Sequence, residues 1–457
     1  VDLKGFEREM EKQRERARKV SVSKELTLIW KVHAVVATPF VGYHDLKHKS
    51  VIIDLVVDGK AADTVQKGRK ASLILETTPF YGEMGGQVGD AGQIRGASGV
   101  FAVTNTVRVP PDIIVHQGQV AEGSFAVGDE VEAEVDRERR LDIARNHTAT
   151  HLLQFALRQV LGQHVQQRGS LVAPNQFRFD FSHLTAMLKE EIEAVQHMVN
   201  EKILQNLPVY DEEVPYKKAI EEGAIALFDE KYGDVVRVLK IGKPPLSAEL
   251  CGGTHVASTG EIGFFQIVSE SSIGAGLRRI EAMTGRGAEA FIKQRFASLE
   301  HIARSLHTLP DEIESKVSAI ASEFELERRQ RLALEKELAR LRTESLLAQA
   351  EEIKGVKVLI ARVPSTRLEI MREMADFIRD KLKSVIVVLG TVYEDKPAFL
   401  AAVTSDLVAK GYDAGKIVRE VAKATGGGGG GKPNLAQAGG KDKEKLDEAL
   451  RLAKSLI

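Results

Sequence analysis

The chain has 457 residues, more than one hydrophobic core usually supports, so several domains are expected. Its 64 Lys and Arg residues balance 65 Asp and Glu residues, which excludes a strong overall positive charge for attracting nucleic acid. The single cysteine, Cys251, excludes an internal disulfide and fits a reducing cytoplasmic compartment, and no apolar run approaches the roughly 18 residues of a membrane span, so no membrane partner is predicted.

Residues 1–24 are predicted to be an N-terminal helical segment, because Phe6 and Met10 lie four apart among many charged residues. The chain opens with Val1 directly into this stretch, which suggests a piece of a longer protein. Residues 25–140 contain short β-branched runs, such as 26–36, 50–57 and 71–76, separated by Gly, Asp and Pro. This pattern predicts a small β-barrel, in which Gly85-Gly86-Gln87 forms a β-turn.

Residues 141–286 mix helical and strand patterns and are expected to form an α+β domain. Residues 287–355, rich in Ala, Leu, Glu and Arg, predict a linker of two helices separated near Pro310. The second helix carries an apolar stripe that Glu327 and Arg331 interrupt, so a helical hairpin and a coiled coil both stay open. The stripe consists of Ile313, Val317, Ile320, Phe324, Leu334, Leu338 and Leu341.

Residues 356–457 predict a small α/β domain with strands at 358–363, 385–389 and 398–403, a helix at 368–382 and two terminal helices. Six consecutive glycines, residues 426–431, lie between those last two helices. A flexible linker is the simplest interpretation of such a run, but linkers rarely lie between two helices of one small domain.

The chemistry of the chain is predicted to lie in the α+β domain. His147 and His151 are four apart in a helical stretch, so their imidazoles project from one face, one turn apart. Cys251-Gly252-Gly253-Thr254-His255 places a thiol and an imidazole on a glycine-rich loop. Two histidines with a Cys-x-x-x-His loop form a ligand set typical of zinc, Zn2+. A zinc peptidase is excluded, since Thr148 stands where such enzymes have a glutamate base.

Three segments resemble the editing domain of alanyl-tRNA synthetases: residues 145–151 (RNHTATH), 251–255 (CGGTH) and 276–281 (GLRRIE). Residues 81–90 resemble the barrel of that family and residues 426–440 the glycine-rich signature of its C-terminal domain. The resemblance implies a multidomain α+β fold: a β-barrel, a zinc-containing editing domain, a helical linker and a C-terminal tRNA-binding domain. It also implies that the domain for charging tRNA lies outside this sequence.

The resemblance implies hydrolysis of seryl- or glycyl-tRNA(Ala), a second sieve for amino acids that an alanine pocket cannot exclude by binding. Thr150 and Gln167 match positions where the family discriminates serine. Without the resemblance, Thr150 is expected to bond back to its own helix and Gln167 to lie in a solvated loop.

Arg278 and Arg279 are candidates for binding phosphates near the tRNA 3′ end, with Gly274 and Gly276 allowing close backbone approach. The alternative is a pair of salt-bridging arginines at the start of a helix. In the C-terminal domain, which has a small local excess of Lys and Arg, the resemblance implies contact with the tRNA elbow and a homodimer interface. The candidate residues for tRNA binding there are Gly429, Gly430 and Lys432.

Two questions stay open. Four protein ligands normally close a structural zinc site, whereas catalysis needs an open position, so zinc either activates water or orients the aminoacyl group. A free-standing trans-editing deacylase, or a tRNA-binding and oligomerisation module with structural zinc, also fits the ligand pattern.

Overall fold

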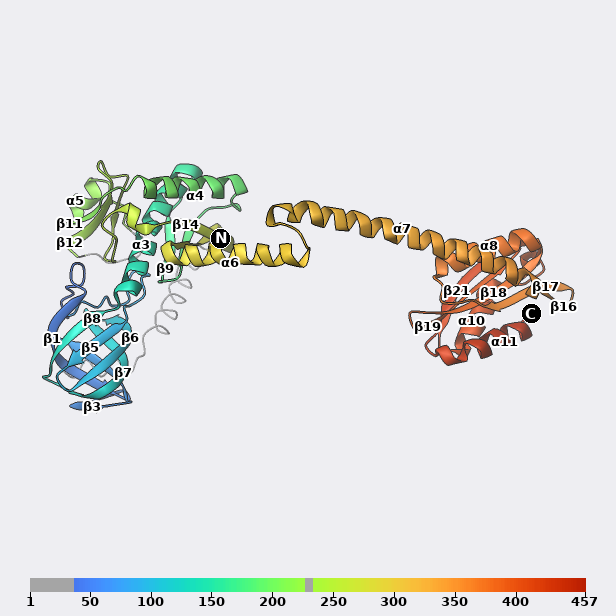
Figure 1. The fold of residues 1–457 in the computed structure, drawn as a ribbon, viewed down its shortest axis with the longest axis horizontal. Coiled ribbons are helices and arrows are strands. Elements are labelled where there is room, and N and C mark those ends of the chain that lie inside the picture. Colours follow the sequence, from blue (N-terminus) through green and yellow to red (C-terminus); the bar gives the residue numbers. More distant parts are fainter. Residues whose placement is uncertain (1–36, 227–232) are drawn as a thin grey trace, which may run out of the picture. The chain divides into compact units, whose positions relative to one another are not determined.

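The structure is a computed structural model that describes residues 37–226 and 233–457. The predicted helix in residues 1–24 and the predicted strand at 26–36 lie outside the described residues. The chain divides into two compact units, Val1–Leu299 and Glu300–Ile457 (Figure 1). Among the described helices, none combines the length and apolar character that a bilayer crossing requires.

The first part of unit one is a closed barrel of six antiparallel strands in the order β1-β4-β7-β6-β5-β8, in which β8 pairs back with β1. Alternate side chains point inward along each strand, and the interior holds Leu73, Ile94, Phe101 and Phe125. Two short strands, β2 and β3, extend β1 and β7. The strands are β1 Lys47–Val57, β2 Lys60–Ala61, β3 Thr64–Gln66, β4 Lys70–Leu75, β5 Gly92–Gly96, β6 Gly99–Val109, β7 Ile113–Ala126 and β8 Glu130–Val135.

The predicted turn at Gly85-Gly86-Gln87 is confirmed. Met84 and Gln87 exchange backbone hydrogen bonds of 3.3 and 3.0 Å, and Gly85 and Gly86 have φ values of 59° and 82°. Two consecutive positive φ angles are typical of the tight turns that join antiparallel segments, and glycine adopts them without strain.

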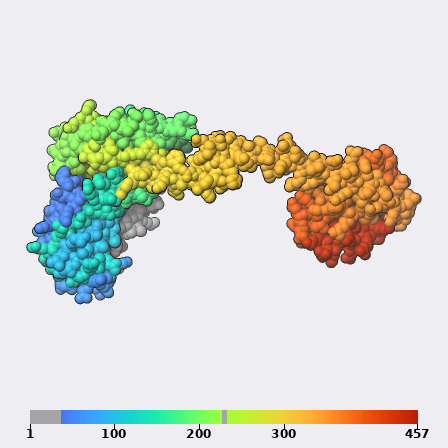
Figure 2. All heavy atoms as spheres, in the orientation of Figure 1, coloured from blue at the N-terminus to red at the C-terminus, as the bar shows by residue number. Residues whose placement is uncertain are grey.

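Helix α3, Arg137–Leu161, joins the barrel to the α+β part of unit one. The Arg140 guanidinium, almost completely buried, pairs with Asp90 and donates to the carbonyls of Gly42 at 2.7 Å and Pro79 at 2.8 Å. Each of the three nitrogens of the buried guanidinium thus donates a hydrogen bond, which offsets part of the cost of its desolvation. The two parts adjoin in the space-filling view, where the barrel is blue to cyan (Figure 2).

The α+β part has a four-stranded antiparallel sheet, β14-β15-β10-β9, and a three-stranded sheet, β11-β12-β13. Helices α3 and α4 pack together, and the core between them and the sheet contains Leu153, Phe177, Phe179, Val195 and Ile280. The elements are β9 Gln167–Val172, β10 Phe177–Ser182, α4 Lys189–Leu204, β11 Val209–Pro215, α5 Tyr216–Glu221, β12 Val235–Ile241, β13 Ser247–Leu250, η1 Thr259–Ile262, β14 Phe265–Gly274 and β15 Leu277–Thr284.

The helices begin slightly before the positions that the sequence suggests. Helix α3 begins at Arg137 rather than near 141, because the Asp136 carboxylate caps it by accepting from the Arg139 amide. The first turn of α3 is charged, so the apolar periodicity begins one turn late. Helix α6, Gly285–Ser305, begins with two glycines in three residues, which read as loop in the sequence.

Pro310 begins a short 3-10 turn, η2 Pro310–Glu312, and α7 then runs as one helix, Ile313–Leu346. Along the predicted apolar stripe of α7, most side chains are exposed: Val317, Ile320, Phe324, Leu334, Leu338 and Leu341. The hairpin and the coiled coil therefore both remain predictions.

The C-terminal domain is a mixed six-stranded sheet, β16-β17-β18-β19-β21-β20, with only the β17–β18 pair parallel. Helix α8 and the end of α7 cover one face of this sheet, and α10 and α11 cover the other. The elements are η3 Leu347–Gln349, β16 Glu351–Ile353, β17 Val356–Arg362, α8 Leu368–Leu382, β18 Val385–Tyr393, β19 Lys396–Val403, α9 Ser405–Ala409, α10 Ala414–Ala424, β20 Gly428–Lys432, β21 Leu435–Gly439, η4 Lys443–Lys445 and α11 Leu446–Ser455.

The glycine run is not a linker. Residues Gly428–Lys432 form the edge strand β20, which pairs antiparallel with β21 through a turn at Pro433 and Asn434. A side chain on Gly427, Gly429 or Gly431 would overlap the neighbouring strand, so alternate positions of this strand require glycine.

Candidate metal centre

His147 and His151 lie on the buried face of α3, one turn apart as predicted. Their rings stack with centroids 5.4 Å apart and an angle of 10° between the planes. Both side chains are buried, so neither imidazole is a simple surface group. The helix therefore presents two parallel imidazoles to one point.

Cys251 and His255 lie on the loop that follows β13. Arg237 on β12 donates to the carbonyls of Cys251 at 3.0 Å and Gly253 at 2.8 Å, and the Tyr43 hydroxyl donates to the Gly252 carbonyl at 2.8 Å. A side chain at Gly253 would overlap the His147 ring, so the loop can approach α3 only with glycine there. These contacts hold the loop against the helix.

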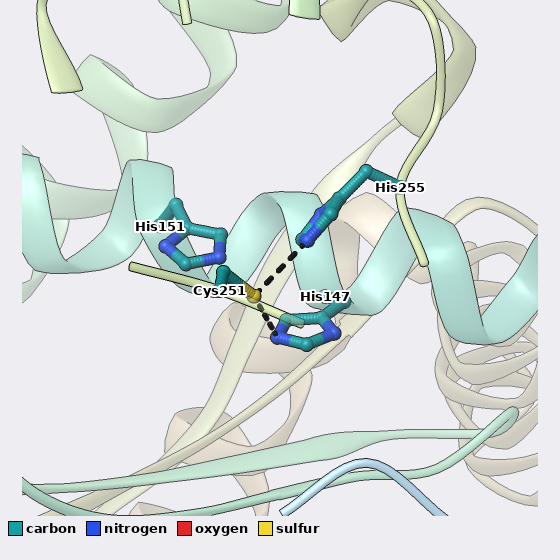
Figure 3. Close-up of side chains that lie close together, drawn as sticks. All are labelled: His147, His151, Cys251 and His255. Carbon is teal, nitrogen blue, oxygen red and sulfur yellow. Dashed lines mark hydrogen bonds between the residues drawn. The ribbon is translucent and has the colours of Figure 1, made fainter. Parts of the chain in front are cut away.

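The structure brings the four predicted ligands together. The Cys251 Sγ lies 3.4 Å from His147 Nε2 and 3.2 Å from His255 Nε2. One donor atom from each of His147, His151, Cys251 and His255 lies within 4.8 Å of the others. Figure 3 shows the three imidazoles arranged around the sulfur. A group of this composition and spacing can hold a metal ion.

The outer nitrogen of each imidazole has its own hydrogen-bond partner. His147 Nδ1 lies 2.7 Å from Gln87 Oε1, His151 Nδ1 lies 2.9 Å from Glu249 Oε2, and His255 Nδ1 lies 3.2 Å from Thr148 Oγ1. Histidines that bind metals commonly hold their second nitrogen in this way. The inner nitrogen of His151, Nε2, is buried and has no hydrogen-bond partner among the described residues, as expected of a nitrogen that serves as a metal ligand.

The protonation of the group fits metal binding. Burial raises the pKa of the Cys251 thiol, but the neighbouring imidazoles, His147 first, outweigh burial and lower this pKa well below its usual value, which favours the thiolate that binds metals. Burial lowers the pKa of His255 to about 3, so this imidazole is neutral. For His151, burial acts downward, but Glu249 and Cys251 outweigh it and raise the pKa to about 10. A cation binding here would displace that proton.

The predicted discriminating residues are placed as follows. Thr150 is buried on α3, and its hydroxyl donates to the Asn146 carbonyl at 2.8 Å, the backbone contact expected of an ordinary helical threonine. Gln167 begins β9 rather than lying in a loop, and its amide donates to Ser170 Oγ at 3.1 Å.

Arg278 and Arg279 lie on strand β15, so the expectation of a helix start was wrong. The side chains that follow Gly276 point alternately to the two faces of the β14–β15 hairpin, which is the period of a strand and not of a helix. Arg278 pairs with Glu270 at 2.5 Å and Arg279 with Asp180 at 2.7 Å, both across neighbouring strands. Gly274 and Gly276 form the turn between β14 and β15, where Gly276 has φ 72°.

The C-terminal candidates lie far along the chain from this centre, on strand β20 of the second unit. A side chain at Gly430 would meet only Arg419 Nη2, at 3.8 Å, whereas Gly429 faces Ala438 of β21. Lys432 is exposed at the end of the strand.

Sequence reasoning missed the residues that hold the imidazoles. Thr148 was considered only as the residue that excludes a peptidase, and Gln87 only as part of a turn. Glu249 had a usable signal, because it lies in an extended segment two residues before Cys251, and side chains two apart in extended backbone point to the same side. Gln87 had none, since it comes from a separate part of the chain.

Three family models match the chain. The model for class II (A) tRNA synthetases matches residues 1–139, that for the "Threonyl and Alanyl tRNA synthetase second additional domain" matches residues 236–281, and that for the DHHA1 domain matches residues 355–457. The second match covers the loop with Cys251 and His255. These matches relate the chain to the class II aminoacyl-tRNA synthetases and to the editing-associated second additional domain of the threonyl and alanyl enzymes.

Individual relatives point to one member of this class, the alanine–tRNA ligases. The chain is 52% identical over 462 residues to an alanine–tRNA ligase of Dehalococcoides mccartyi, covering all of this chain and 53% of that protein. It is 44% identical to the alanine–tRNA ligase of Bacillus subtilis, covering 98% of this chain and 51% of that protein. The C-Ala domain of alanyl-tRNA synthetase from Aquifex aeolicus matches 23% of this chain and 96% of that structure, at 32% identity and a TM-score of 0.22.

The chain belongs to the alanyl-tRNA synthetase family and corresponds to the C-terminal half of its members. It spans about half the length of the curated relatives that it matches.

Proposed function

We propose that this chain carries a zinc-dependent editing activity, the hydrolysis of seryl- and glycyl-tRNA(Ala). The observation that carries the proposal is the group of three imidazoles and one cysteine sulfur, with donor atoms within 4.8 Å of one another. The match of residues 236–281 to the second additional domain of threonyl- and alanyl-tRNA synthetases supports it. We further propose that the protein is cytoplasmic, in keeping with its single reduced cysteine.

The residues fit zinc better than a hard cation. Nitrogen and thiolate donors suit zinc, whereas magnesium and calcium take oxygen ligands. His147, His151, Cys251 and His255 would hold the ion, and the unpartnered Nε2 of His151 would gain a ligand bond. When bound, zinc would supply a Lewis acid, which can polarise an ester carbonyl or acidify a water molecule.

Thr150, which precedes the ligand His151 on α3, and Gln167 on β9 are proposed to select serine. The Thr150 hydroxyl donates its proton to Asn146, so it can only accept a hydrogen bond from the hydroxyl of a serine substrate. Gln167 uses its amide nitrogen on Ser170 and keeps its carbonyl oxygen for a substrate donor. A cognate alanyl ester offers no such hydroxyl, so it gains nothing from either residue.

The tRNA is proposed to contact both units. In unit one, the hairpin at Gly274 and Gly276 and the arginines of β15 are the candidates for the 3′ end. Arg279 is the more exposed of the two arginines, with 27% of its side chain accessible against 12% for Arg278, so it is better placed to share its charge with a phosphate. In unit two, β20 is the candidate for contact with the tRNA elbow, and the same domain is the candidate dimer interface.

A binding and oligomerisation module with structural zinc is the second candidate. The specific observation in its favour is that four protein donors converge, the number that closes a structural zinc site. The two functions differ in whether the chain turns over a mischarged ester.

The test is the release of labelled serine from seryl-tRNA(Ala), with alanyl-tRNA(Ala) as the control substrate. We expect the wild-type chain to hydrolyse the serine ester alone, and Cys251→Ala to lose this activity because the centre loses its anionic ligand. Circular dichroism would show that the variant is folded. No hydrolysis by zinc-loaded wild type, with tRNA still bound, would instead favour the binding module.

A further inference from the structure

One residue of the barrel contacts both segments that carry the proposed metal ligands, helix α3 and the Cys251–His255 loop. Gln87 follows the glycine turn, is fully buried, and lies against α3 and the Cys251–His255 loop. Its side chain makes three hydrogen bonds, all to residues outside the barrel. This is unusual for a residue of a barrel turn, which normally faces solvent.

The hydrogen bonds fix the orientation of the Gln87 amide. The backbone N–H of Thr254 points at one end of it at 2.9 Å, and a backbone N–H can only donate, so that end is the oxygen, Oε1. The same oxygen lies 2.7 Å from His147 Nδ1, which must therefore carry a proton. In the neutral imidazole that binds a metal, the lone pair is then on Nε2, the nitrogen that faces the Cys251 sulfur.

The other end of the amide holds the second ligand segment. Gln87 Nε2 donates to Thr254 Oγ1 at 3.0 Å, and Thr254 stands between Cys251 and His255 in the loop. One side chain therefore joins the helix that carries two ligands to the loop that carries the other two.

The backbone around Gln87 is also fixed. Val172 of β9 donates to the Gly86 carbonyl at 2.7 Å, and Val88 donates to the Val172 carbonyl at 3.1 Å. A side chain at Gly86 would overlap Ser170 of β9. The turn is thus hydrogen-bonded to strand β9 on both sides of Gln87, which gives the Gln87 side chain little freedom.

We propose that Gln87 is a positioning residue of the metal centre, which sets the tautomer of His147 and holds the thiol-bearing loop against α3. The barrel is then a component of the centre. This inference rests on the proposed zinc site, but it is independent of which ester is hydrolysed.

The test measures zinc affinity in the full chain, by competition with a chromophoric chelator, together with the absorption spectrum of the cobalt-substituted protein. Gln87→Met removes both ends of the amide at similar volume, and we expect about 10- to 100-fold weaker zinc binding and an altered cobalt spectrum. Gln87→Glu keeps an oxygen that accepts from His147 and from Thr254, so its affinity should stay close to wild type. Gln93→Met, on the exposed face of β5, is the matched control and should behave as wild type.

Three outcomes would overturn the inference. If Gln87→Met binds zinc as tightly as Gln93→Met, the hydrogen bonds of Gln87 to His147 and Thr254 do not contribute to metal binding. Equal weakening in Gln87→Glu and Gln87→Met would indicate general packing rather than an acceptor for His147. If the wild-type chain binds no zinc, the metal centre itself is absent, which is a failure of the proposed function that the other two outcomes do not share.

Discussion

His116 of strand β7 is a buried polar residue outside the metal centre. Its Nδ1 donates to the Leu73 carbonyl at 3.0 Å, and its Nε2 lies 2.7 Å from the Thr78 hydroxyl, which donates to it. Burial lowers the pKa of His116 to about 4, although the bond to Leu73 acts in the opposite direction. The imidazole is therefore neutral in the folded barrel.

This predicts a loss of barrel stability in mild acid. As the pH falls below about 6.5, the unfolded chain binds a proton at His116 while the folded barrel does not, so the free energy of unfolding decreases until the pH reaches about 4. The pKa difference corresponds to about 3 kcal/mol. Hydrogen exchange of β4 and β7 amides across this range would measure it.

Two variants separate the contribution of His116 to the pH dependence from that of other groups. His116→Gln should have a shallower pH dependence than wild type, whatever its stability at neutral pH. The exposed His197→Gln on α4 should retain the wild-type dependence. An unchanged slope in His116→Gln would show that other groups cause the acid sensitivity.

At the scale of one element, the glycines of strand β20 have two possible roles. They either leave room for the neighbouring strand β21 or give the backbone conformational freedom. A Cβ at Gly429 would overlap Ala438 of β21, whereas a Cβ at Gly428 would have no atom of the described residues within 4 Å. The two positions are adjacent in one strand and differ mainly in what they face, so they form a matched pair.

We predict that Gly429→Ala destabilises the β20–β21 hairpin by about 1–3 kcal/mol, the usual cost of overpacking. Gly428→Ala should change its stability by less than about 0.5 kcal/mol, as exposed substitutions usually do. Hydrogen exchange at the β21 amides measures both. Equal effects would mean that the run is selected for backbone freedom instead.

Elements with a strong period could be predicted from the sequence, and others could not. The helix expected at residues 368–382 is α8, because its apolar residues repeat at helical spacing between clear breaks. Strand β20 carries no side-chain pattern at all, so nothing distinguishes it from a linker. The four ligand residues were recognisable by type and spacing, but Gln87 joins them only through tertiary structure, which no local pattern encodes.

At the scale of the whole molecule, the metal centre and its hydrogen-bond partners all belong to the first compact unit. The candidates for the tRNA elbow and for dimerisation belong to the second. Zinc binding and these two functions should therefore be separable by shortening the chain.

We predict that a chain ending at residue 309, after α6, binds one zinc ion as tightly as the full chain. Its affinity for tRNA should fall, and sedimentation should show a monomer if the full chain is a dimer. Zinc titration, tRNA binding and analytical ultracentrifugation on both chains would measure these effects. Loss of zinc binding on removal of residues 310–457 would contradict the separation.

Cys251 is the only thiol in the chain, and its sulfur lies among the three imidazoles. A thiol-directed alkylating reagent therefore has one target, and any molecule that it modifies has lost the anionic donor of the centre. The mass of the modified protein then counts the disabled molecules in a preparation directly, without tRNA and without an activity assay.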